Sequence, residues 1–284
     1  MNENTKKTVA ITGSCGGLGK RICLALASRG YDLIFIDRNR EKSERFADQL
    51  KAKFATLTVT FVTCDLTDTS SVKAAIERLL TLKFDTLLLN SGVYNVPIVT
   101  CDTGYNNVFQ VNFLSQYAMV RQLIERGSGL KKVVAISSVA HRYGVLDEND
   151  IDYSTRKKPS KIYGNSKRFL TFSLYEYFKD RTDVSIAVAH PGVTLTNMTN
   201  HYPKFINPIV KLGIKLVFPS PDKAIRSIVC GVEERCDYME WIGPRVFDVW
   251  GLPKKIKLKS CSVEESEKIA FFAQNAYERW LKTN

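Results

Sequence analysis

The chain has few of the residues from which metal sites and disulfide frameworks are built. Only three histidines occur in 284 residues, and the seven cysteines are scattered without a Cys-x-x-Cys pair. Neither a metal centre nor a set of disulfides fits this pattern, whereas reduced thiols in a cytoplasmic protein do. We therefore expect no metal ligands and a cytoplasmic location.

Long apolar runs are also missing. No stretch of about 18 uncharged apolar residues occurs, so we expect no membrane-spanning helix. No apolar segment precedes Thr8, so we expect no signal peptide.

Acidic side chains are scarce relative to basic ones. The chain has 29 Asp and Glu against 41 Lys and Arg, which gives a formal net charge of +12. Such an excess suits nucleic acid, an acidic membrane surface or anionic small molecules. Because no nucleic-acid-binding motif is present, we interpret the charge as a solvated basic surface with one anionic ligand, and expect no nucleic-acid partner.

A glycine-rich turn near the start of the chain separates a predicted strand from a predicted helix. The β-branched run Thr8 to Thr12 indicates a buried strand, and residues 20–30 have helical periodicity. The turn between them, GSCGGLG, supplies Gly13, Ser14, Gly17, Leu18 and Gly19. Glycines let the backbone approach a pyrophosphate, and the helix N-terminus attracts its charge. The turn therefore predicts dinucleotide binding.

Asp37 and Arg38 argue for different dinucleotides. Asp37 ends the next predicted strand, DLIFID, about 20 positions beyond the glycines, where a carboxylate accepts hydrogen bonds from the adenosine ribose and repels a 2′-phosphate. Arg38 could instead hold that phosphate. We favour NAD(H), with NADP(H) as the alternative.

Predicted strands and helices alternate along most of the chain. Strands are expected at 58–64, 86–90, 132–138 and before Pro191, with helices at 40–53, from about 69, and at 105–126. This alternation predicts an α/β fold, with a single Rossmann-type, doubly wound parallel sheet and helices on both faces. Ligands bind at the carboxyl ends of such strands, where Asp65-Leu66, Asn90-Ser91-Gly92 and Ser137-Ser138 fall.

Tyr163 and Lys167 stand one helical turn apart in SKIYGNSKRFLTFSL. At this spacing both project from one helix face. An ammonium beside a phenol favours phenolate, which would lower the pKa of Tyr163 toward the range of a general acid/base. The structural alternative is a half-buried tyrosine with a solvated lysine.

Together these motifs resemble, in order, those of the short-chain dehydrogenase/reductases over roughly residues 8–243. The matching elements are TGSCGGLG, Asp65-Leu66, LNSG with Asn90 and Gly92, Asn112, Ser138, Tyr163-x-x-x-Lys167 and Pro191-Gly192. The segments SSVAHRYG and HPGVTLTNM look most like the retinol-dehydrogenase-like and hydroxysteroid-dehydrogenase-like branch.

The resemblance implies an NAD(P)-dependent oxidoreductase that interconverts an alcohol and its ketone or aldehyde by hydride transfer. It makes Tyr163 the acid/base, Lys167 its activator and a ligand of the nicotinamide ribose, Ser138 the donor to the substrate oxygen, and Asn112 the holder of a water. It also implies a homodimer or homotetramer. The implied cofactor-binding residues are Gly13, Ser14, Gly17, Leu18, Gly19, Asp37, Arg38, Asp65, Leu66, Asn90, Gly92, Tyr163, Lys167, Pro191, Gly192, Val193 and Thr196.

Residues beyond the family pattern suggest the substrate. We treat 1–284 as one domain, with a substrate lid at 197–221 and a C-terminal extension with a helix at 252–282. The 197–221 stretch mixes aromatic, aliphatic and basic residues. This mixture suits a lid over an apolar pocket or a peripheral membrane contact, which are compatible with each other. The structural alternative is an ordinary packed helix between two prolines. A bulky apolar steroid, retinoid or long-chain substrate follows from the lid interpretation.

Three further expectations concern the end of the chain and its overall role. LPKKIKLKS at 252–260 predicts a solvated edge, and Ser262 to Glu265 predicts a capping box. A catalytically idle NAD(P)-sensing or partner-binding protein on the same fold is the rival function. Such a protein should have a broken Ser-Tyr-Lys set, and here the set is intact.

Overall fold

The computed structural model of the protein describes residues 6–192 and 221–283. Within these ranges the strands form one eight-stranded sheet in the order β3-β2-β1-β4-β5-β6-β7-β8. Most strands are short apolar runs bounded by polar turns, as expected for a sheet covered on both faces, whereas the last strand is largely exposed at the edge of the sheet. They are β1 (Thr8–Thr12), β2 (Asp32–Asp37), β3 (Val59–Thr63), β4 (Thr86–Leu89), β5 (Lys132–Ile136), β6 (Ser185–Ala189), β7 (Glu240–Val246) and β8 (Trp250–Lys257).

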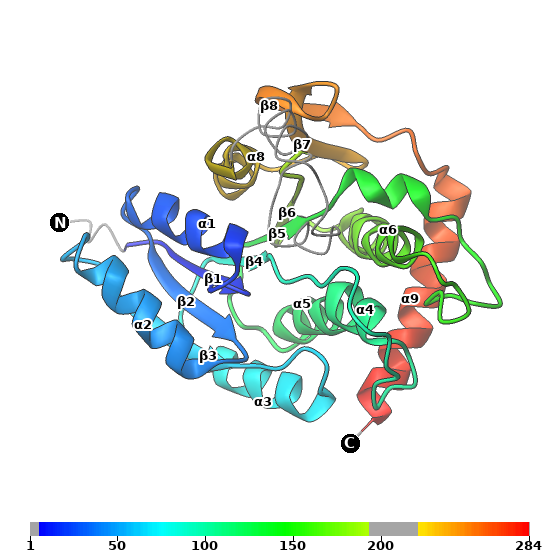
Figure 1. Cartoon of the computed structure of the whole chain (residues 1–284), viewed down its shortest axis with the longest axis horizontal. Coiled ribbons are helices and arrows are strands. Elements are labelled where there is room, and N and C mark those ends of the chain that lie inside the picture. The colour runs from blue at the N-terminus through cyan, green and yellow to red at the C-terminus, as the bar shows by residue number, and fades with distance from the viewer. Residues whose placement is uncertain (1–5, 193–220, 284) are drawn as a thin grey trace, which may run out of the picture.

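Two helical layers cover the sheet (Figure 1). One apolar core lies under α1 (Gly17–Ala27), α2 (Arg40–Lys51) and α8 (Pro221–Glu233). The other lies under α3 (Thr69–Leu80), α5 (Ser115–Glu125), α6 (Pro159–Phe178) and α9 (Val263–Lys282). The predicted doubly wound α/β fold is confirmed.

The strand order reverses between β1 and β4, which both pair with parallel neighbours. Loops leaving the two strands diverge there, and this opens a crevice for a ligand at the carboxyl edge. The sheet departs from a purely parallel one only at its last described strand, because the turn between β7 and β8 is too short for a crossover and makes the pair antiparallel.

The expected helix at 105–126 is interrupted by a wider turn. It consists of α4 (Asn107–Phe109), the π-helical segment η1 (Gln110–Leu114) and α5. Asn106 caps α4 by accepting a hydrogen bond from Phe109 N at 2.9 Å. A π-helical segment inside a helix redirects side chains and is frequent at functional sites, and here it carries Asn112.

The sequence predicted neither a membrane-spanning helix nor a metal site. None of its helices is long and apolar enough to cross a membrane. No group of three or more His, Cys, Asp or Glu residues within 6–192 and 221–283 is arranged to hold a metal ion.

Candidate active site

The glycine turn adopts a conformation that only glycine fits. Gly13 has a φ of +69°, and a Cβ there would lie 2.7 Å from Ser91 Oγ. A Cβ at Gly19 would lie 2.2 Å from Gly13 O. The first turn of α1 holds no acidic residue, and Gly16 at its N-cap offers no side-chain acceptor. Backbone N–H groups are thus left to an anion, which fits a pyrophosphate.

Asp37 is bound to the glycine turn. Its carboxylate accepts hydrogen bonds from the Ser14 hydroxyl, from Ser43 Oγ at 3.2 Å and from Cys15 N at 3.4 Å. The end of β2 is thereby fixed to the start of α1, which places a carboxylate where a ribose would lie. Of the other predicted residues here, Leu18 packs against the core, whereas Gly17 begins α1.

Arg38 and Asp65 face each other across the outer end of the crevice. Arg38 is exposed, and its Nη1 lies 3.8 Å from Asp65 Oδ2. The other Asp65 oxygen accepts a hydrogen bond from Thr67 N at 2.9 Å, so Asp65 also shapes its own turn. The N-cap of α3 is Asp68, which accepts a hydrogen bond from Ser71 N. Leu66 is buried in the core.

Asn90 connects the loop after β4 to the glycine turn. Its Nδ2 donates to Thr12 O and to Gly13 O, both at 2.9 Å. Gly92 follows, and a Cβ there would lie 3.5 Å from Asn112 Oδ1 and 3.8 Å from Lys167 Nζ. A Cβ at Gly92 would therefore be in van der Waals contact with both the Asn112 amide and the Lys167 ammonium.

Asn112 is fully buried, and its amide points from η1 toward Gly92. Its Oδ1 accepts a hydrogen bond from Val93 N at 2.7 Å, and its Nδ2 donates to Val93 O and to Ser166 Oγ, each at 3.0 Å. Ser166 Oγ in turn donates to Tyr163 O at 2.8 Å. Asn112 thus fastens the loop after β4 to the helix that carries Tyr163 and Lys167.

Ser138, Tyr163 and Lys167 meet at the carboxyl edge of β5. Ser138 caps the 3₁₀ helix η2 (Val139–Tyr143), where its hydroxyl accepts a hydrogen bond from Ala140 N at 3.2 Å. The same hydroxyl is close enough to the Tyr163 phenol to influence its pKa. Lys167 Nζ lies 5.9 Å from the centroid of the Tyr163 ring and donates to Ile136 O at 2.8 Å. Lys167 is buried, so the alternative of a solvated lysine does not apply.

Burial governs the protonation of this pair. It raises the pKa of Tyr163 to about 12, although the Ser138 hydroxyl opposes the rise. It lowers the pKa of Lys167 to about 8. The sequence-based expectation that Lys167 lowers the pKa of Tyr163 is not met, because both groups lose hydration and the Lys167 ammonium donates to the Ile136 carbonyl.

Replacing Lys167 with methionine is expected to raise the melting temperature while impairing the site. Native Lys167 gives up its proton near pH 8, whereas the unfolded chain keeps it up to about pH 10.5. Between these values the unfolded state binds more protons, so wild-type stability rises with pH. Thermal denaturation should show the largest gain for Lys167→Met below pH 8 and little gain near pH 10.5.

The matched control is Lys161→Met, which changes an exposed lysine of the same helix. It should show no such dependence on pH. A stability difference for Lys167→Met that is constant from pH 7 to pH 10.5 would contradict the assignment of a buried, partly deprotonated ammonium.

His190 holds the segment after β6 and was not predicted from the sequence. Its Nδ1 accepts a hydrogen bond from Gly192 N at 3.1 Å, so Nε2 carries the proton, and that atom lies 3.5 Å from Asp248 Oδ1. This separation is too long for a strong hydrogen bond or ion pair. Burial lowers the pKa of His190, and Asp248 only partly opposes this shift. Gly192 has a φ of +76°. Val193 and Thr196, and the lid apart from Pro221, lie outside the described residues.

The segment between β8 and α9, residues 258–262, is called the C-terminal segment here. It supports the Ser138 loop through His141, a second histidine that was not predicted from the sequence. His141 is buried in η2, and burial lowers its pKa to about 4, so it is neutral. Its Nδ1 lies 2.7 Å from Ser138 O, and its Nε2 lies 2.6 Å from Ser260 Oγ. Because a carbonyl only accepts, Nδ1 carries the proton and Nε2 accepts from the serine.

Arg168 anchors the same segment from the other side. It is buried next to Lys167 and donates to Ser260 O at 3.0 Å. Its guanidinium also pairs with both carboxylate oxygens of Glu265, with Nη2 at 2.5 Å from Oε2. Only half of the predicted capping box therefore forms. Ser262 Oγ accepts from Glu265 N at 3.1 Å, but the Glu265 side chain turns to Arg168.

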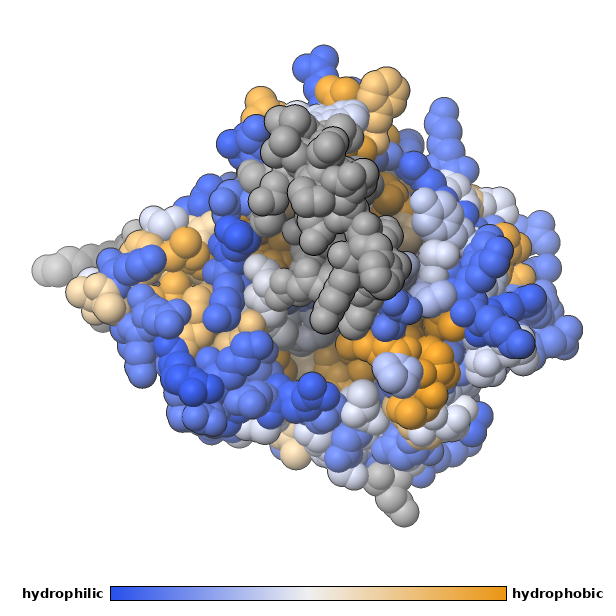
Figure 2. All heavy atoms as spheres, in the orientation of Figure 1, coloured by the Kyte–Doolittle hydropathy of each residue, from blue (hydrophilic) through white to orange (hydrophobic). Residues whose placement is uncertain are grey.

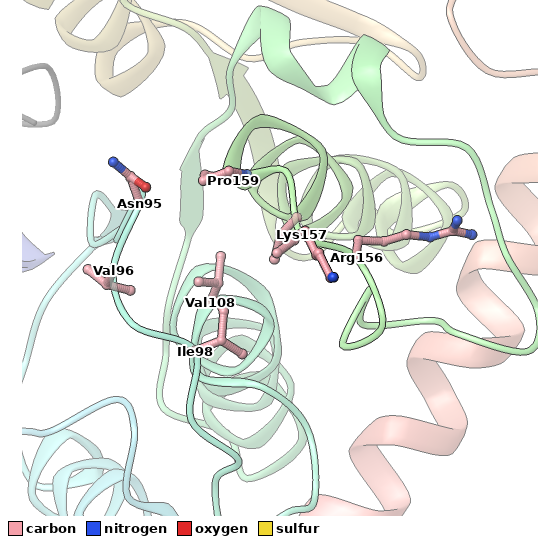
Figure 3. A pocket seen from close by; sticks show the side chains of 8 residues that line it. Asn95, Val96, Ile98, Val108, Arg156, Lys157 and Pro159 are labelled. Atoms are coloured by element: carbon pink, nitrogen blue, oxygen red, sulfur yellow. The ribbon is translucent and has the colours of Figure 1, made fainter. Parts of the chain in front are cut away.

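A cavity of about 260 Å³ lies between the loop after β4, α4 and the start of α6 (Figure 3). Apolar lining residues come both from the loop after β4 with α4 and from the start of α6. Figure 3 shows the Arg156 guanidinium extending away from these apolar residues, and Arg156 pairs with Asp147. Two lining residues adjoin Tyr94 and Tyr163, whose rings meet edge-on at 5.4 Å. The lining residues are Asn95, Val96, Ile98, Val108, Arg156, Lys157, Pro159 and Ile162.

A doubly wound sheet with a glycine turn at its carboxyl edge defines a Rossmann-type dinucleotide-binding protein. A family model described as short chain dehydrogenase matches residues 7–206. The chain belongs to the short-chain dehydrogenase family, as its motifs indicated.

Two similar curated proteins support the retinol-dehydrogenase-like placement. Retinol dehydrogenase 13 of Homo sapiens is 29% identical over 202 residues, which cover 69% of this chain and 61% of the relative. Retinol dehydrogenase 12 of Mus musculus is 32% identical over 201 residues, which cover 69% and 64%. The chain thus matches less than two thirds of the length of these relatives.

Solved structures share the fold. A putative uncharacterized protein from Mycobacterium paratuberculosis superposes with a TM-score of 0.73 at 22% identity, over 98% of this chain and 94% of that one. A short-chain dehydrogenase from Sphingobium yanoikuyae in complex with NADPH has a TM-score of 0.58 at 20% identity, over 80% and 84%. A Burkholderia phymatum family member in complex with NAD has a TM-score of 0.59 at 21% identity, over 84% and 90%.

Proposed function

We propose that the protein is an NAD(P)-dependent oxidoreductase that interconverts an alcohol and its ketone or aldehyde. The observation that carries the proposal is the meeting of the Ser138 and Tyr163 hydroxyls beside the buried Lys167 ammonium. Two hydroxyls that face each other can bind one substrate oxygen, and the phenol can exchange a proton with it. When bound, the nicotinamide supplies or accepts the hydride.

Each side chain has a distinct proposed role. Tyr163 exchanges the proton of the substrate hydroxyl, and Ser138 donates a hydrogen bond that orients the oxygen. Lys167 binds the ribose hydroxyls of the nicotinamide half, and its charge stabilises phenolate once the cofactor and substrate exclude water. Asn112 and Lys167 both lie next to Gly92, and a water held there would continue the proton path.

We favour NAD(H), because Asp37 supplies a carboxylate at the ribose position. Solved members of the fold contain either NAD or NADPH, so the preference depends on Asp37 and Arg38. Replacing Asp37 with asparagine keeps an acceptor for Ser14 but removes the charge that repels a 2′-phosphate. We expect the ratio of NADPH to NADH affinity to rise about tenfold, equivalent to about 1.4 kcal/mol, in fluorescence titrations.

Arg38→Gln is the matched variant at the adjacent position, and it should lower NADPH affinity with little effect on NADH. If wild-type protein already binds NADPH more tightly and Asp37→Asn changes nothing, Arg38 governs the site and our preference for NAD(H) is wrong.

The substrate is proposed to be bulky and apolar. The cavity between the loop after β4, α4 and the start of α6 has Val96, Val108 and Ile162 in its wall, and the similar curated proteins are named as retinol dehydrogenases. A steroid, retinoid or long-chain alcohol fits such a wall.

A cofactor titration followed by a panel of alcohols and carbonyls tests the function. Turnover of apolar compounds with NAD(H) or NADP(H) is the expected result. Tight cofactor binding with no turnover on any steroid, retinoid or aliphatic compound would favour the idle sensor instead. The homodimer or homotetramer and the cytoplasmic location implied by the sequence stay predictions.

A further inference from the structure

The turn between β7 and β8 holds a bulky residue in an unfavourable conformation. Val249 N donates to Val246 O at 3.0 Å, which closes a turn with Phe247 and Asp248 at its centre. Their φ values are +51° and +56°. Two-residue hairpin turns of this kind usually contain Asn and Gly, and aspartate also tolerates the left-handed region. Phenylalanine does not, so Phe247 carries the backbone strain.

Packing within the described chain does not explain Phe247, because this residue is 85% exposed. Leu252 on β8 is 67% exposed, and Val246 is 43% exposed. We call Val246, Phe247 and Leu252 the hairpin tip. Figure 2 shows apolar spheres beside hydrophilic ones at this outer end of the hairpin, at the top of the view. Strain that persists without burial points to a function for the exposed ring.

Basic side chains flank the hairpin tip. Arg245 and Lys254 are exposed on the two strands next to it, and neither forms an ion pair with any residue in the described ranges. The acidic residue of the turn, Asp248, is already paired with Arg142 at 2.9 Å. The end of the hairpin is therefore apolar at its apex and cationic at its base.

This combination selects one kind of partner. Apolar side chains next to unpaired cations match a bilayer with anionic headgroups, where the cations contact the headgroups and the apolar groups reach the acyl boundary. A protein strand adding to the edge of β8 is disfavoured, because Pro253 and Lys254 interrupt and charge that edge.

We propose that the β7–β8 hairpin is a contact for an anionic membrane surface. Val246, Phe247 and Leu252 enter the headgroup boundary, and Arg245 and Lys254 bind anionic headgroups. This contact goes beyond the proposed oxidoreductase activity and does not depend on it.

The hairpin is also connected to the active-site edge. The Asp248 carboxylate holds Arg142, which belongs to the helix that begins at Ser138. A Cβ at Gly192 would lie 3.2 Å from the Asp248 and Val249 carbonyl oxygens. A protein docked through the hairpin would therefore present the mouth of its site toward the bilayer, from which an apolar alcohol could enter.

Vesicle co-sedimentation with the full chain tests the proposal. Wild-type protein is expected to bind phosphatidylcholine vesicles containing phosphatidylserine, and to bind less at high salt or to phosphatidylcholine alone. Phe247→Asn is the decisive variant, because asparagine suits the left-handed turn and should preserve or raise the melting temperature. Its affinity for the serine-containing vesicles should fall about tenfold or more.

Phe271→Asn is the matched control, since Phe271 is 62% exposed but lies on α9; it should bind like wild type. Lys254→Gln should weaken binding only to serine-containing vesicles, whereas Lys53→Gln, an exposed lysine elsewhere, should not. The proposal is overturned if wild-type protein binds no vesicles, if it binds both lipid compositions equally, or if Phe247→Asn binds as wild type does.

Discussion

Tyr163→Phe is expected to reduce turnover by about 10²–10⁴-fold, the range typical of a lost general acid/base, while cofactor binding is retained. The substitution removes one hydroxyl and leaves a ring of nearly the same shape, so the edge-on contact with Tyr94 at 5.4 Å is preserved. Only the proton exchange and the polar interaction with the Ser138 hydroxyl are lost. Steady-state assays on the best substrate, with a parallel NADH titration, measure both properties.

Tyr94→Phe is the control for this experiment. Tyr94 contributes the neighbouring ring but lies on the loop after β4, so its phenol should not be required for proton exchange. If Tyr163→Phe keeps more than half of wild-type turnover, another group exchanges the proton and the proposed role of Tyr163 is wrong.

The sequence was sufficient to predict which segments meet at the carboxyl edge of the sheet, where the candidate site lies, because that information is local. The glycine turn, the loop around Asn90 and the serine pair each follow directly from an apolar strand, and a parallel sheet brings all such ends to one edge. The spacing of Tyr163 and Lys167 likewise fixes the face of α6 that they share.

The protonation of the site could not be predicted in the same way. A spacing of one helical turn indicates that Tyr163 and Lys167 are neighbours, but it contains no information on burial. Burial raises the pKa of Tyr163 and lowers that of Lys167, which reverses the sign expected for the tyrosine. The direction of a pKa shift depends on which of several opposing effects is largest, and only the folded environment determines that.

Contacts between distant segments were missed for a related reason. His141 meets Ser260 across 119 positions, and Arg168 meets Glu265 across 97. The sequence around Ser262 predicted a capping box, because Glu265 stands at the right position for one. Arg168, which is buried next to Lys167, competes for the Glu265 carboxylate. A charge-assisted pair that uses both carboxylate oxygens is stronger than the hydrogen bond that Glu265 would make to an exposed backbone amide in a capping box.

Arg168→Met is expected to lower the free energy of unfolding by about 2–3 kcal/mol, and thus the melting temperature by about 4–12 °C. Removing one partner of a fully buried pair typically costs about 3–5 kcal/mol, and the value here is smaller because the Glu265 side chain is 27% exposed. Thermal denaturation measures the effect. Glu267→Gln provides the control, since it removes an exposed pair between the ends of the same two helices, with Lys179, and should cost less than about 1 kcal/mol.

The double variant Arg168→Met with Glu265→Leu separates the charge effect from packing. If an uncompensated carboxylate causes the loss, replacing both charges should restore most of the stability. If the loss instead comes from the hydrogen bond to Ser260 O, the double variant should be as unstable as the single one, and turnover should fall in both because Ser260 supports His141 below Ser138. A single variant as stable as wild type would show that the C-terminal segment is held in place without this ion pair.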